Sequence, residues 1–350
     1  MSHRTLRRLT WLLLAAWAGG SAAAEPLVVD GPTMGTTYRI VLPSAAATDE
    51  AALRELVEAI LADVDLRLST YRRDSEVSRF NRAAAGEWFA VSPATAEVFA
   101  AALAICERTE GALDITVAPL VRLWHFGPDA IAKTDSPADI APPGEAAIEA
   151  ARMQVGFQRV EVRDDPPALR KQVAGLEVDL SAVGEGDAID RLAAALAARG
   201  IGDYLIELGG EIRAGGCGPR GQPWRVAVNA PRIDRSEAQA VVSLSNMAVA
   251  TSGDYRRYFE HGGRRYSHVI DPTTGRPVDH GLAAVTVAAD ECRTADAWAT
   301  ALMVLGPTRG YQCAEKLDVA ALLVSRDGEQ FIAQETPAWE ARFRTEAPPE

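Results

Sequence analysis

The sequence predicts an α+β fold with mixed or antiparallel sheets and flanking helices. Strand-like and helix-like segments follow one another in mixed order, without the regular βαβ alternation of a parallel sheet. Gly-rich connections separate the strand-like segments, and no segment repeats at a fixed period. Of the 350 residues, 48% are hydrophobic, which is enough for a sizeable core. We therefore expect a single large domain over residues 25–335 and a loose C-terminal tail over residues 336–350.

The N-terminal half contains one expected strand and three expected helices. Residues 37–42 are typical of a strand, and residues 49–68 carry leucine, isoleucine and valine at helical spacing. An Ala-rich helix is expected over residues 93–109, and a further helix over residues 145–154. Residues 127–144 contain four prolines and several aspartates, which favours a surface loop or a seam between two halves.

The second half is richer in expected strands. A helix over residues 188–199 is ended by Gly200, and another helix is expected over residues 294–305. Residues 271–275 (DPTTG) predict a tight turn. The expected strands of this half cover residues 157–163, 175–180, 203–213, 223–229, 240–250, 264–270 and 283–289.

The first 24 residues have the order of a secretory signal peptide. Three arginines in the first eight residues precede an apolar run over residues 9–18, and small residues follow at 22–24. The apolar run is too short to span a bilayer. We expect cleavage after Ala24 and an exported, periplasmic protein that is soluble after cleavage. No cysteine lies near this point, so a lipid anchor is not expected.

The charge argues against a nucleic-acid partner, and the cysteine spacing argues against a zinc site. The formal net charge is −12, and removal of the three arginines of the signal segment makes it −15, so nucleic acid is not an expected partner. The cysteines are scattered and form no C-x-x-C pair, which argues against a zinc site and leaves their pairing open. They are Cys106, Cys217, Cys292 and Cys313.

Common nucleotide and hydrolase signatures are absent or lack their context. Residues 216–221 match the letters of the dinucleotide pattern G-x-G-x-x-G, but an expected strand follows where that pattern needs a helix. A hairpin turn is the better interpretation. The sequence has no G-x-x-x-x-G-K-[ST], no H-E-x-x-H and no G-x-S-x-G.

Polar and glycine residues instead cluster in six blocks where a core needs neither. These blocks are residues 34–36, 69–81, 111–124, 178–186, 208–212, and 250–255 continuing to 266–272. Their content and order resemble the ApbE family of FAD:protein FMN transferases, over residues 28–310. The resemblance implies an ApbE-like, T-fold-related fold. It also implies transfer of FMN from FAD, through a phosphoester, to a Thr or Ser hydroxyl of another protein, with release of AMP.

Asp296 and Thr300 are the candidate metal ligands. They stand at i and i+4, on one face of an expected helix, and offer the hard oxygens that Mg²⁺ prefers. From spacing alone, a structural role is the alternative to a metal site: the aspartate would cap a helix or be solvated, and the threonine would bond to its own helix. The resemblance implies Mg²⁺ at this pair. It adds the backbone carbonyl of Ala182, in a strand-to-helix loop, and that of Ala299 as a further ligand.

The resemblance also implies a set of flavin contacts. A strand ending in a Gly-rich turn is expected at residues 179–186, where backbone N–H groups can meet an anion. Asp187 departs from the aromatic residue that is usual in the family. For the aromatic and thioether side chains, stacking on a ring competes with core packing. The implied flavin contacts are Met34, Tyr71, Ala112, Leu113, Asp114, Asp179, Glu185 and Ile270.

His268 is the candidate catalytic base. Attack of a hydroxyl on phosphorus requires removal of its proton, and histidine is suited to this near neutral pH. A lone histidine in a strand is more often a satisfied structural residue, so the assignment depends on the resemblance.

The implied partners are FAD and acceptor subunits of membrane-bound electron-transfer complexes (Rnf/Nqr-type) and related exported proteins, with a transient membrane-protein contact. Two alternative hypotheses for the function stay open: an exported FAD carrier without chemistry, and an FAD pyrophosphatase that uses water as acceptor. The sequence does not name the acceptor, the balance between transfer and hydrolysis, or the oligomeric state.

Overall fold

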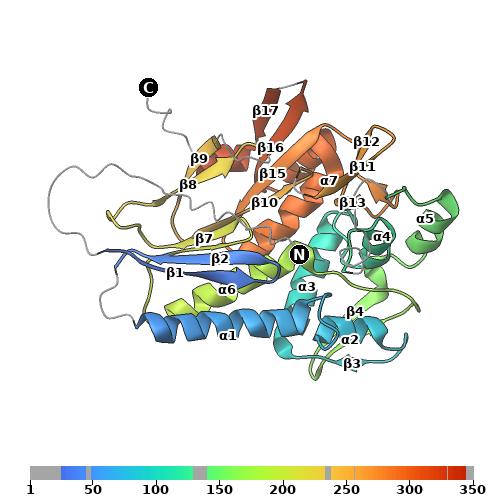
Figure 1. Cartoon of the computed structure of the whole chain (residues 1–350), viewed down its shortest axis with the longest axis horizontal. Coiled ribbons are helices and arrows are strands. Elements are labelled where there is room, and N and C mark those ends of the chain that lie inside the picture. Colours follow the sequence, from blue (N-terminus) through green and yellow to red (C-terminus); the bar gives the residue numbers. More distant parts are fainter. Residues whose placement is uncertain are drawn as a thin grey trace, which may run out of the picture.

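The computed structural model describes residues 25–44, 49–128, 140–232, 238–255, 257–328 and 330–343. Its largest element is an eight-stranded sheet in which neighbouring strands are antiparallel (Figure 1). From edge to edge the strands are β1 (Leu27–Thr33), β2 (Thr36–Leu42), β6 (Tyr204–Leu208), β7 (Glu211–Gly215), β10 (Met247–Gly253), β15 (Leu282–Ala289), β16 (Ala320–Asp327) and β17 (Gln330–Glu335). The antiparallel sheet with flanking helices confirms the α+β prediction.

Smaller antiparallel sheets carry the remaining described strands. The three-stranded one has the order β3 (Phe89–Ala90), β5 (Pro167–Lys171), β4 (Val160–Asp164). The hairpins pair β8 (Trp224–Asn229) with β9 (Ala238–Leu244), β11 (Tyr258–His261) with β12 (Arg264–Ser267), and β13 (Ile270–Asp271) with β14 (Arg276–Pro277).

Two long helices, α6 and α7, pack against each other and against the strands of the large sheet. Helix α1 lies alongside α6 (Figure 1). The helices are α1 (Glu50–Leu68), α2 (Glu76–Arg82), α3 (Pro93–Arg108), α4 (Ala118–Leu123), α5 (Glu145–Arg152), α6 (Ser181–Ala197), α7 (Cys292–Lys316) and α8 (Pro337–Arg342), with a 3₁₀ turn at Phe157–Arg159.

The central strands β15 and β16 of the large sheet are buried on both faces. Side chains of a strand point alternately to its two sides, so neighbouring residues enter different cores. On β16, Leu323 belongs to the main core, which also contains Leu302 of α7. Its neighbour Leu322 belongs to a second core with Trp224 of β8 and Trp339 of α8. The β8–β9 hairpin and α8 therefore cover the face opposite α6 and α7.

The start of α6 differs from the prediction. We expected a strand over residues 175–180 and a Gly-rich turn before a helix at residues 188–199. The described backbone there has only an isolated bridge between Glu177 and Val117, and the helix already begins at Ser181. The carboxylate of Asp179 accepts bonds from the N–H and hydroxyl of Ser181 at 2.8 and 2.5 Å, which stabilises this earlier start.

The boundaries of several strands also differ from the prediction. The predicted strand 203–213 is a hairpin, because Gly209 and Gly210 adopt positive φ angles of 67° and 120° and reverse the chain between β6 and β7. Residues 240–250 likewise contain the end of β9 and the start of β10, and residues 264–270 are divided between β12 and β13. The 157–163 segment begins as a 3₁₀ turn.

The expectation of a loose tail from residue 336 is wrong for residues 337–342. Thr336 caps α8 by accepting from the N–H of Trp339 at 3.3 Å, and the Trp339 side chain is 1% exposed. A buried tryptophan on a capped helix is part of the domain.

Several predictions are confirmed: the strand at 37–42, the helices at 49–68, 93–109 and 145–154, and the helix at 294–305, which lies within α7. The four cysteines, all within the described residues, form no disulfide. The predicted signal segment and most of the 127–144 loop (129–139) lie outside the described residues. In the part of the chain that is described, no helix is long and apolar enough to cross a membrane.

Candidate active site

Asp296 and Thr300 lie one turn apart on α7, as their spacing predicted. The Asp296 carboxylate is 7% exposed, and the N–H of Gly186 donates to its Oδ2 at 3.4 Å. The Thr300 hydroxyl lies 3.0 Å from that of Ser252 at the end of β10. Neither residue is at the start of the helix, so Asp296 is not a local cap.

The surroundings of Asp296 are acidic. Burial, followed by the negative charge of Glu185, raises the pKa of Asp296 well above its usual value. Glu185 lies against the β6–β7 turn: a Cβ added at Gly209 would be 2.3 Å from Glu185 Oε2 and 3.0 Å from Glu211 Oε2. Glu211 is itself 6% exposed. A nearby cation favours the charged form of a carboxylate whose pKa is raised in this way, so Asp296 is a suitable cation ligand.

This donor set fits Mg²⁺ better than a metal that needs a full protein cage. Among the described residues, no three His, Cys, Asp or Glu side chains gather so as to hold a metal ion. Mg²⁺ characteristically takes one or two carboxylates and fills its remaining positions with water and phosphate oxygens. Asp296 with the Thr300 hydroxyl supplies hard oxygen ligands of this kind.

The two backbone ligands implied by the resemblance lie on helices. Ala182 is the second residue of α6, so the strand-to-helix loop expected there is wrong; the carbonyl lies in the first turn of the helix. Ala299 is fully buried on α7, next to Thr300. Their roles as ligands stay predictions.

Asp114 and Asp179 organise two neighbouring segments. Asp114 Oδ1 accepts from the N–H and hydroxyl of Thr116 at 2.8 and 2.6 Å, and Oδ2 accepts from the N–H of Phe157 at 3.0 Å. Burial nevertheless raises the pKa of Asp114. The N–H of Asp179 donates to the carbonyl of Ile115 at 2.8 Å, so the 112–114 segment and the start of α6 lie together. Both aspartates therefore shape the backbone of the site.

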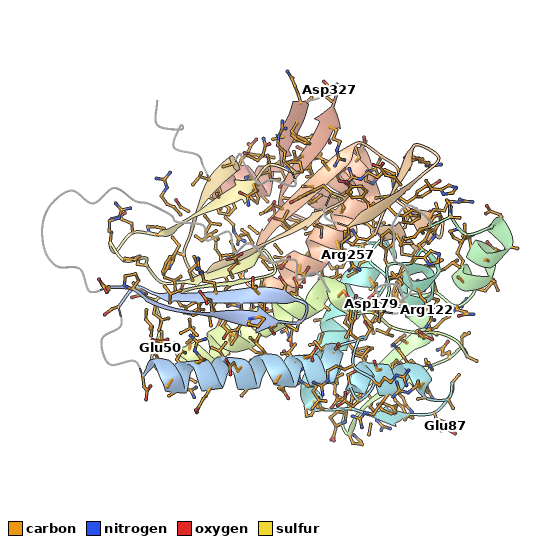
Figure 2. The ribbon with its side chains drawn as sticks, in the orientation of Figure 1. Glu50, Glu87, Arg122, Asp179, Arg257 and Asp327 are labelled. Carbon is orange, nitrogen blue, oxygen red and sulfur yellow. The ribbon has the colours of Figure 1, made fainter. Side chains whose placement is uncertain are left out.

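Arg122 of α4 and Asp179, which precedes α6, are both labelled in Figure 2. Arg122 forms an ion pair with Glu177 at 2.7 Å, which joins α4 to the segment before α6, in addition to the bond between Asp179 and Ile115.

The two predicted ring contacts differ in exposure. Tyr71, in the loop between α1 and α2, is 53% exposed, so core packing does not explain its side chain. Met34 occupies the β1–β2 turn with φ of 43° and is partly buried against the main core. Ala112 and Leu113 are buried.

His268 follows β12. Its Nδ1 lies 3.1 Å from the carbonyl oxygen of Arg257, and its ring meets that of Phe126 edge-on, with centroids 6.3 Å apart. A carbonyl only accepts, so this contact places the proton of the neutral ring on Nδ1 and leaves the lone pair on Nε2. Ile270, two residues on, is packed in a cluster with Phe126 and Trp124.

A cavity of about 250 Å³ lies between the 111–114 segment, α5 and the turn after Ile270. Asp114, Phe157 and Thr273 line it, whereas Asp296, Thr300 and His268 do not. The cavity thus brings Asp114 close to the turn that follows Ile270, and the Asp179–Ile115 bond joins the 112–115 segment to the start of α6. The predicted metal pair lies separately on α7.

The sequence did not predict the contacts that Ser252 and Asp190 make with α7. Ser252 belongs to the 250–255 block, but its contact with Thr300 depends on packing across 48 positions of sequence. Asp190 bonds to the first residues of α7 across about a hundred positions. No local sequence signal reports such contacts.

Comparison with known proteins gives a consistent result. A family model described as the ApbE family matches residues 34–323. The FAD:protein FMN transferase of Vibrio cholerae (strain O395) is 41% identical over 326 residues, covering 92% of this chain and 95% of that protein. The FAD:protein FMN transferase of Escherichia coli K12 is 40% identical over 321 residues, covering 91% of this chain and 90% of that protein.

Solved structures agree. The flavin transferase ApbE from Vibrio cholerae has a TM-score of 0.82 and 39% identity, and covers 91% of this chain and 100% of that one. The apo form of the flavinyl transferase ApbE from Pseudomonas stutzeri has a TM-score of 0.82 and 41% identity, and covers 92% of this chain and 98% of that one.

Proposed function

The chain belongs to the ApbE family, and on this premise we propose that it is a Mg²⁺-dependent FAD:protein FMN transferase. It transfers FMN to a Thr or Ser hydroxyl of an exported or membrane-bound electron-transfer flavoprotein. AMP is the second product. The observation that carries the proposal is the buried Asp296 on α7, one turn from Thr300 and beside the acidic Glu185.

Asp296 and Thr300 would hold the metal, with the carbonyls of Ala182 and Ala299 as further candidates. When bound, Mg²⁺ supplies positive charge to the pyrophosphate of FAD as its P–O–P bridge breaks. The chain's own part is to fix the two oxygen ligands: α7 sets their spacing, and Ser252 holds the Thr300 hydroxyl at 3.0 Å.

His268 would take the proton of the acceptor hydroxyl. Its Nδ1 contact with the Arg257 carbonyl fixes the ring and leaves the basic lone pair on Nε2. The acceptor oxygen forms a bond to the phosphorus of the FMN half. The bridging oxygen keeps the electron pair of the broken bond and leaves with AMP, so the step needs no oxidant or reductant.

The exposed Tyr71 ring would stack on an aromatic ring of FAD. Met34, Ala112, Leu113, Asp114, Asp179, Glu185 and Ile270 are the further proposed flavin contacts. Both carboxylate oxygens of Asp114 accept hydrogen bonds from N–H and hydroxyl groups of the protein. We therefore propose that Asp114 supports flavin binding by fixing the backbone of the 112–116 segment.

The proposed setting is outside the cytoplasm. The basic, apolar and small-residue order of residues 1–24 supports export to the periplasm. Acceptor subunits of the Rnf/Nqr type would then meet this enzyme at the membrane surface through a transient contact.

Intact-mass spectrometry tests the proposal. Residues 25–350 are mixed with FAD, Mg²⁺ and an acceptor domain from a flavin-carrying electron-transfer subunit, with and without EDTA. We expect a gain of one FMN on the acceptor that EDTA abolishes. AMP and FMN in solution without acceptor labelling would favour a pyrophosphatase, and unchanged bound FAD would favour a carrier.

A further inference from the structure

Helices α6 and α7 are in close contact at Gly186. A Cβ added there would lie 2.5 Å from Cα and 2.6 Å from N of Arg293, distances that real Cβ atoms do not show. Glycine therefore lets the backbone of α6 rest directly on the first turn of α7.

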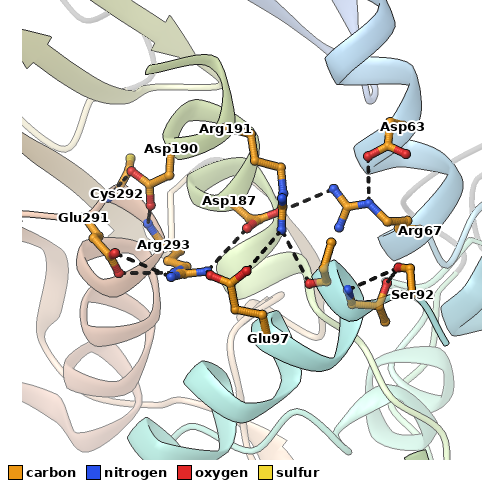
Figure 3. Close-up of polar contacts among 12 residues, drawn as sticks. Asp63, Arg67, Ser92, Glu97, Asp187, Asp190, Arg191, Glu291, Cys292 and Arg293 are labelled. Atoms are coloured by element: carbon orange, nitrogen blue, oxygen red, sulfur yellow. Dashed lines mark hydrogen bonds and ion pairs between the residues drawn. The ribbon is translucent and has the colours of Figure 1, made fainter. Parts of the chain in front are cut away.

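Asp190 stands four residues after Gly186, on the same face of α6. Its Oδ1 accepts from the N–H of Cys292 at 2.9 Å, and its Oδ2 accepts from the N–H of Arg293 at 3.0 Å (Figure 3). The first N–H groups of a helix have no partner within the helix. The local N-cap residue, Glu291, makes no side-chain cap bond, so α7 is capped from another helix.

Asp187 strengthens the same contact. This carboxylate, 1% exposed, accepts from Nε of Arg191 at 2.7 Å and pairs with Arg293 and Arg67 at 3.7 Å each. Figure 3 shows it between these arginines, which reach it from α1, α6 and α7. Arg293 also pairs with Glu97 of α3 at 2.7 Å. An aspartate in place of the family's aromatic residue thus serves a charged network that orients Arg293.

Asp296 is the next residue of α7 on this face, three positions after Arg293 and four after Cys292. It touches α6 through the N–H of Gly186. The same turn of α6 that caps α7 therefore also contacts the metal carboxylate, and any displacement of the α7 start would move Asp296.

We infer that Asp190 is a positioning residue for the metal site: by capping α7 from α6 it fixes the first turn of α7 and the direction of the Asp296 carboxylate. The inference rests on the proposed role of Asp296 in binding Mg²⁺. Loss of a group that orients a metal ligand costs about 10- to 100-fold in metal affinity or activity.

The test compares three changes in the full mature chain. Asp190→Ala removes both cap bonds. Asp190→Ala combined with Glu291→Asp places a short carboxylate at the local N-cap, where aspartate is favoured. Arg213→Gln is the matched control, because Arg213 pairs with Asp190 Oδ1, the oxygen that also accepts from the N–H of Cys292. This change removes the ion pair and keeps the Asp190 carboxylate that accepts both cap bonds.

Two readouts are used. Hydrogen exchange of the metal-free protein reports the amides of Cys292 and Arg293, and the Mg²⁺ concentration for half-maximal FMN transfer reports the site. We expect Asp190→Ala to lose protection at these amides and to raise the half-saturating Mg²⁺ about tenfold, with kcat recovered at high Mg²⁺. Glu291→Asp should restore both, and Arg213→Gln should change neither.

Unchanged exchange in Asp190→Ala would overturn the cap, and lost protection with an unchanged Mg²⁺ requirement would overturn the positioning role. A Mg²⁺ requirement that Arg213→Gln raises equally would assign the effect to the ion pair. If the wild-type chain shows no Mg²⁺ dependence, the proposed magnesium site itself fails, whatever the exchange shows.

Discussion

The hydroxyl oxygens of Ser252 and Thr300 lie 3.0 Å apart, which joins the end of β10 to the side of α7 that carries the proposed metal ligand Thr300. One of the two hydroxyls must donate to the other, and donation by Thr300 would direct its lone pairs away from Ser252. Groups of this kind set the orientation of a metal ligand without touching the metal.

Ser252→Ala is therefore expected to raise the half-saturating Mg²⁺ concentration, by about tenfold on the scale of outer-shell losses. Ser252→Thr keeps the hydroxyl and serves as the matched control, with a requirement close to wild type. The measurement is FMN transfer against Mg²⁺ at saturating FAD. Equal requirements in the alanine and threonine variants would show that the hydroxyl contact plays no part.

Asp296 gives a prediction on stability and pH. Its pKa is raised in the folded protein by burial and by Glu185, so without metal the folded state holds this proton more tightly than the unfolded state. The resulting stability is fully present below the usual value of 3.8 and is lost as pH rises through the folded-state pKa. Ionisation of this carboxylate in the metal-free fold costs stability, and a bound cation would offset that cost.

Asp296→Asn should therefore leave the metal-free protein as stable as wild type, or more stable, at neutral pH, while abolishing Mg²⁺-dependent transfer. Urea unfolding of EDTA-treated protein at several pH values measures the first effect. A variant that unfolds at much lower urea than wild type, or that keeps its activity, would contradict the assignment.

Asp114 is expected to matter for folding more than for binding. Asp114→Ala leaves the N–H of Phe157 and the N–H and hydroxyl of Thr116 without their acceptor, and each such buried group costs about 1–3 kcal/mol. We expect a fall of at least about 2 kcal/mol in the free energy of unfolding. A stable variant with weakened FAD binding would instead assign the carboxylate to the ligand.

The elements that the sequence predicted well depend on local periodicity. The i, i+4 relation of Asp296 and Thr300 holds because α7 keeps its 3.6-residue repeat through both positions. Asp187 could not be interpreted from sequence, because its arginine partners come from α1, α6 and α7. The order of the large sheet, in which β2 pairs with β6, also depends on long-range packing. The α6 start was misplaced because its glycines were taken as a turn signal, whereas Gly186 provides close helix contact.

Tyr71 offers a test of binding without a change in folding. Its side chain is 53% exposed, so Tyr71→Ala should leave the unfolding temperature within about 1–2 °C of wild type, because substitutions of exposed side chains cost little. Loss of ring stacking worth about 0.5–1.5 kcal/mol should raise the KM for FAD by about two- to tenfold. Tyr71→Phe, which keeps the ring, should retain the wild-type KM.

A substitution at His268 tests proton removal separately from metal binding. His268→Ala should lower kcat for FMN transfer by about 10²- to 10⁴-fold, the usual contribution of a general base, and should leave the half-saturating Mg²⁺ unchanged. Transfer by the wild-type enzyme should fall on the acid side as the imidazole becomes protonated, since Nε2 then has no lone pair to accept the hydroxyl proton.

The pH profile of the variant is the decisive control for His268. If the histidine is the base, the acid limb should disappear from the His268→Ala profile, and the remaining rate should rise with pH as the acceptor hydroxyl loses its own proton. His268→Gln keeps a polar side chain of similar reach next to the Arg257 carbonyl but no basic nitrogen. Near-normal transfer by this glutamine variant would reduce His268 to a structural contact with Arg257 and Phe126.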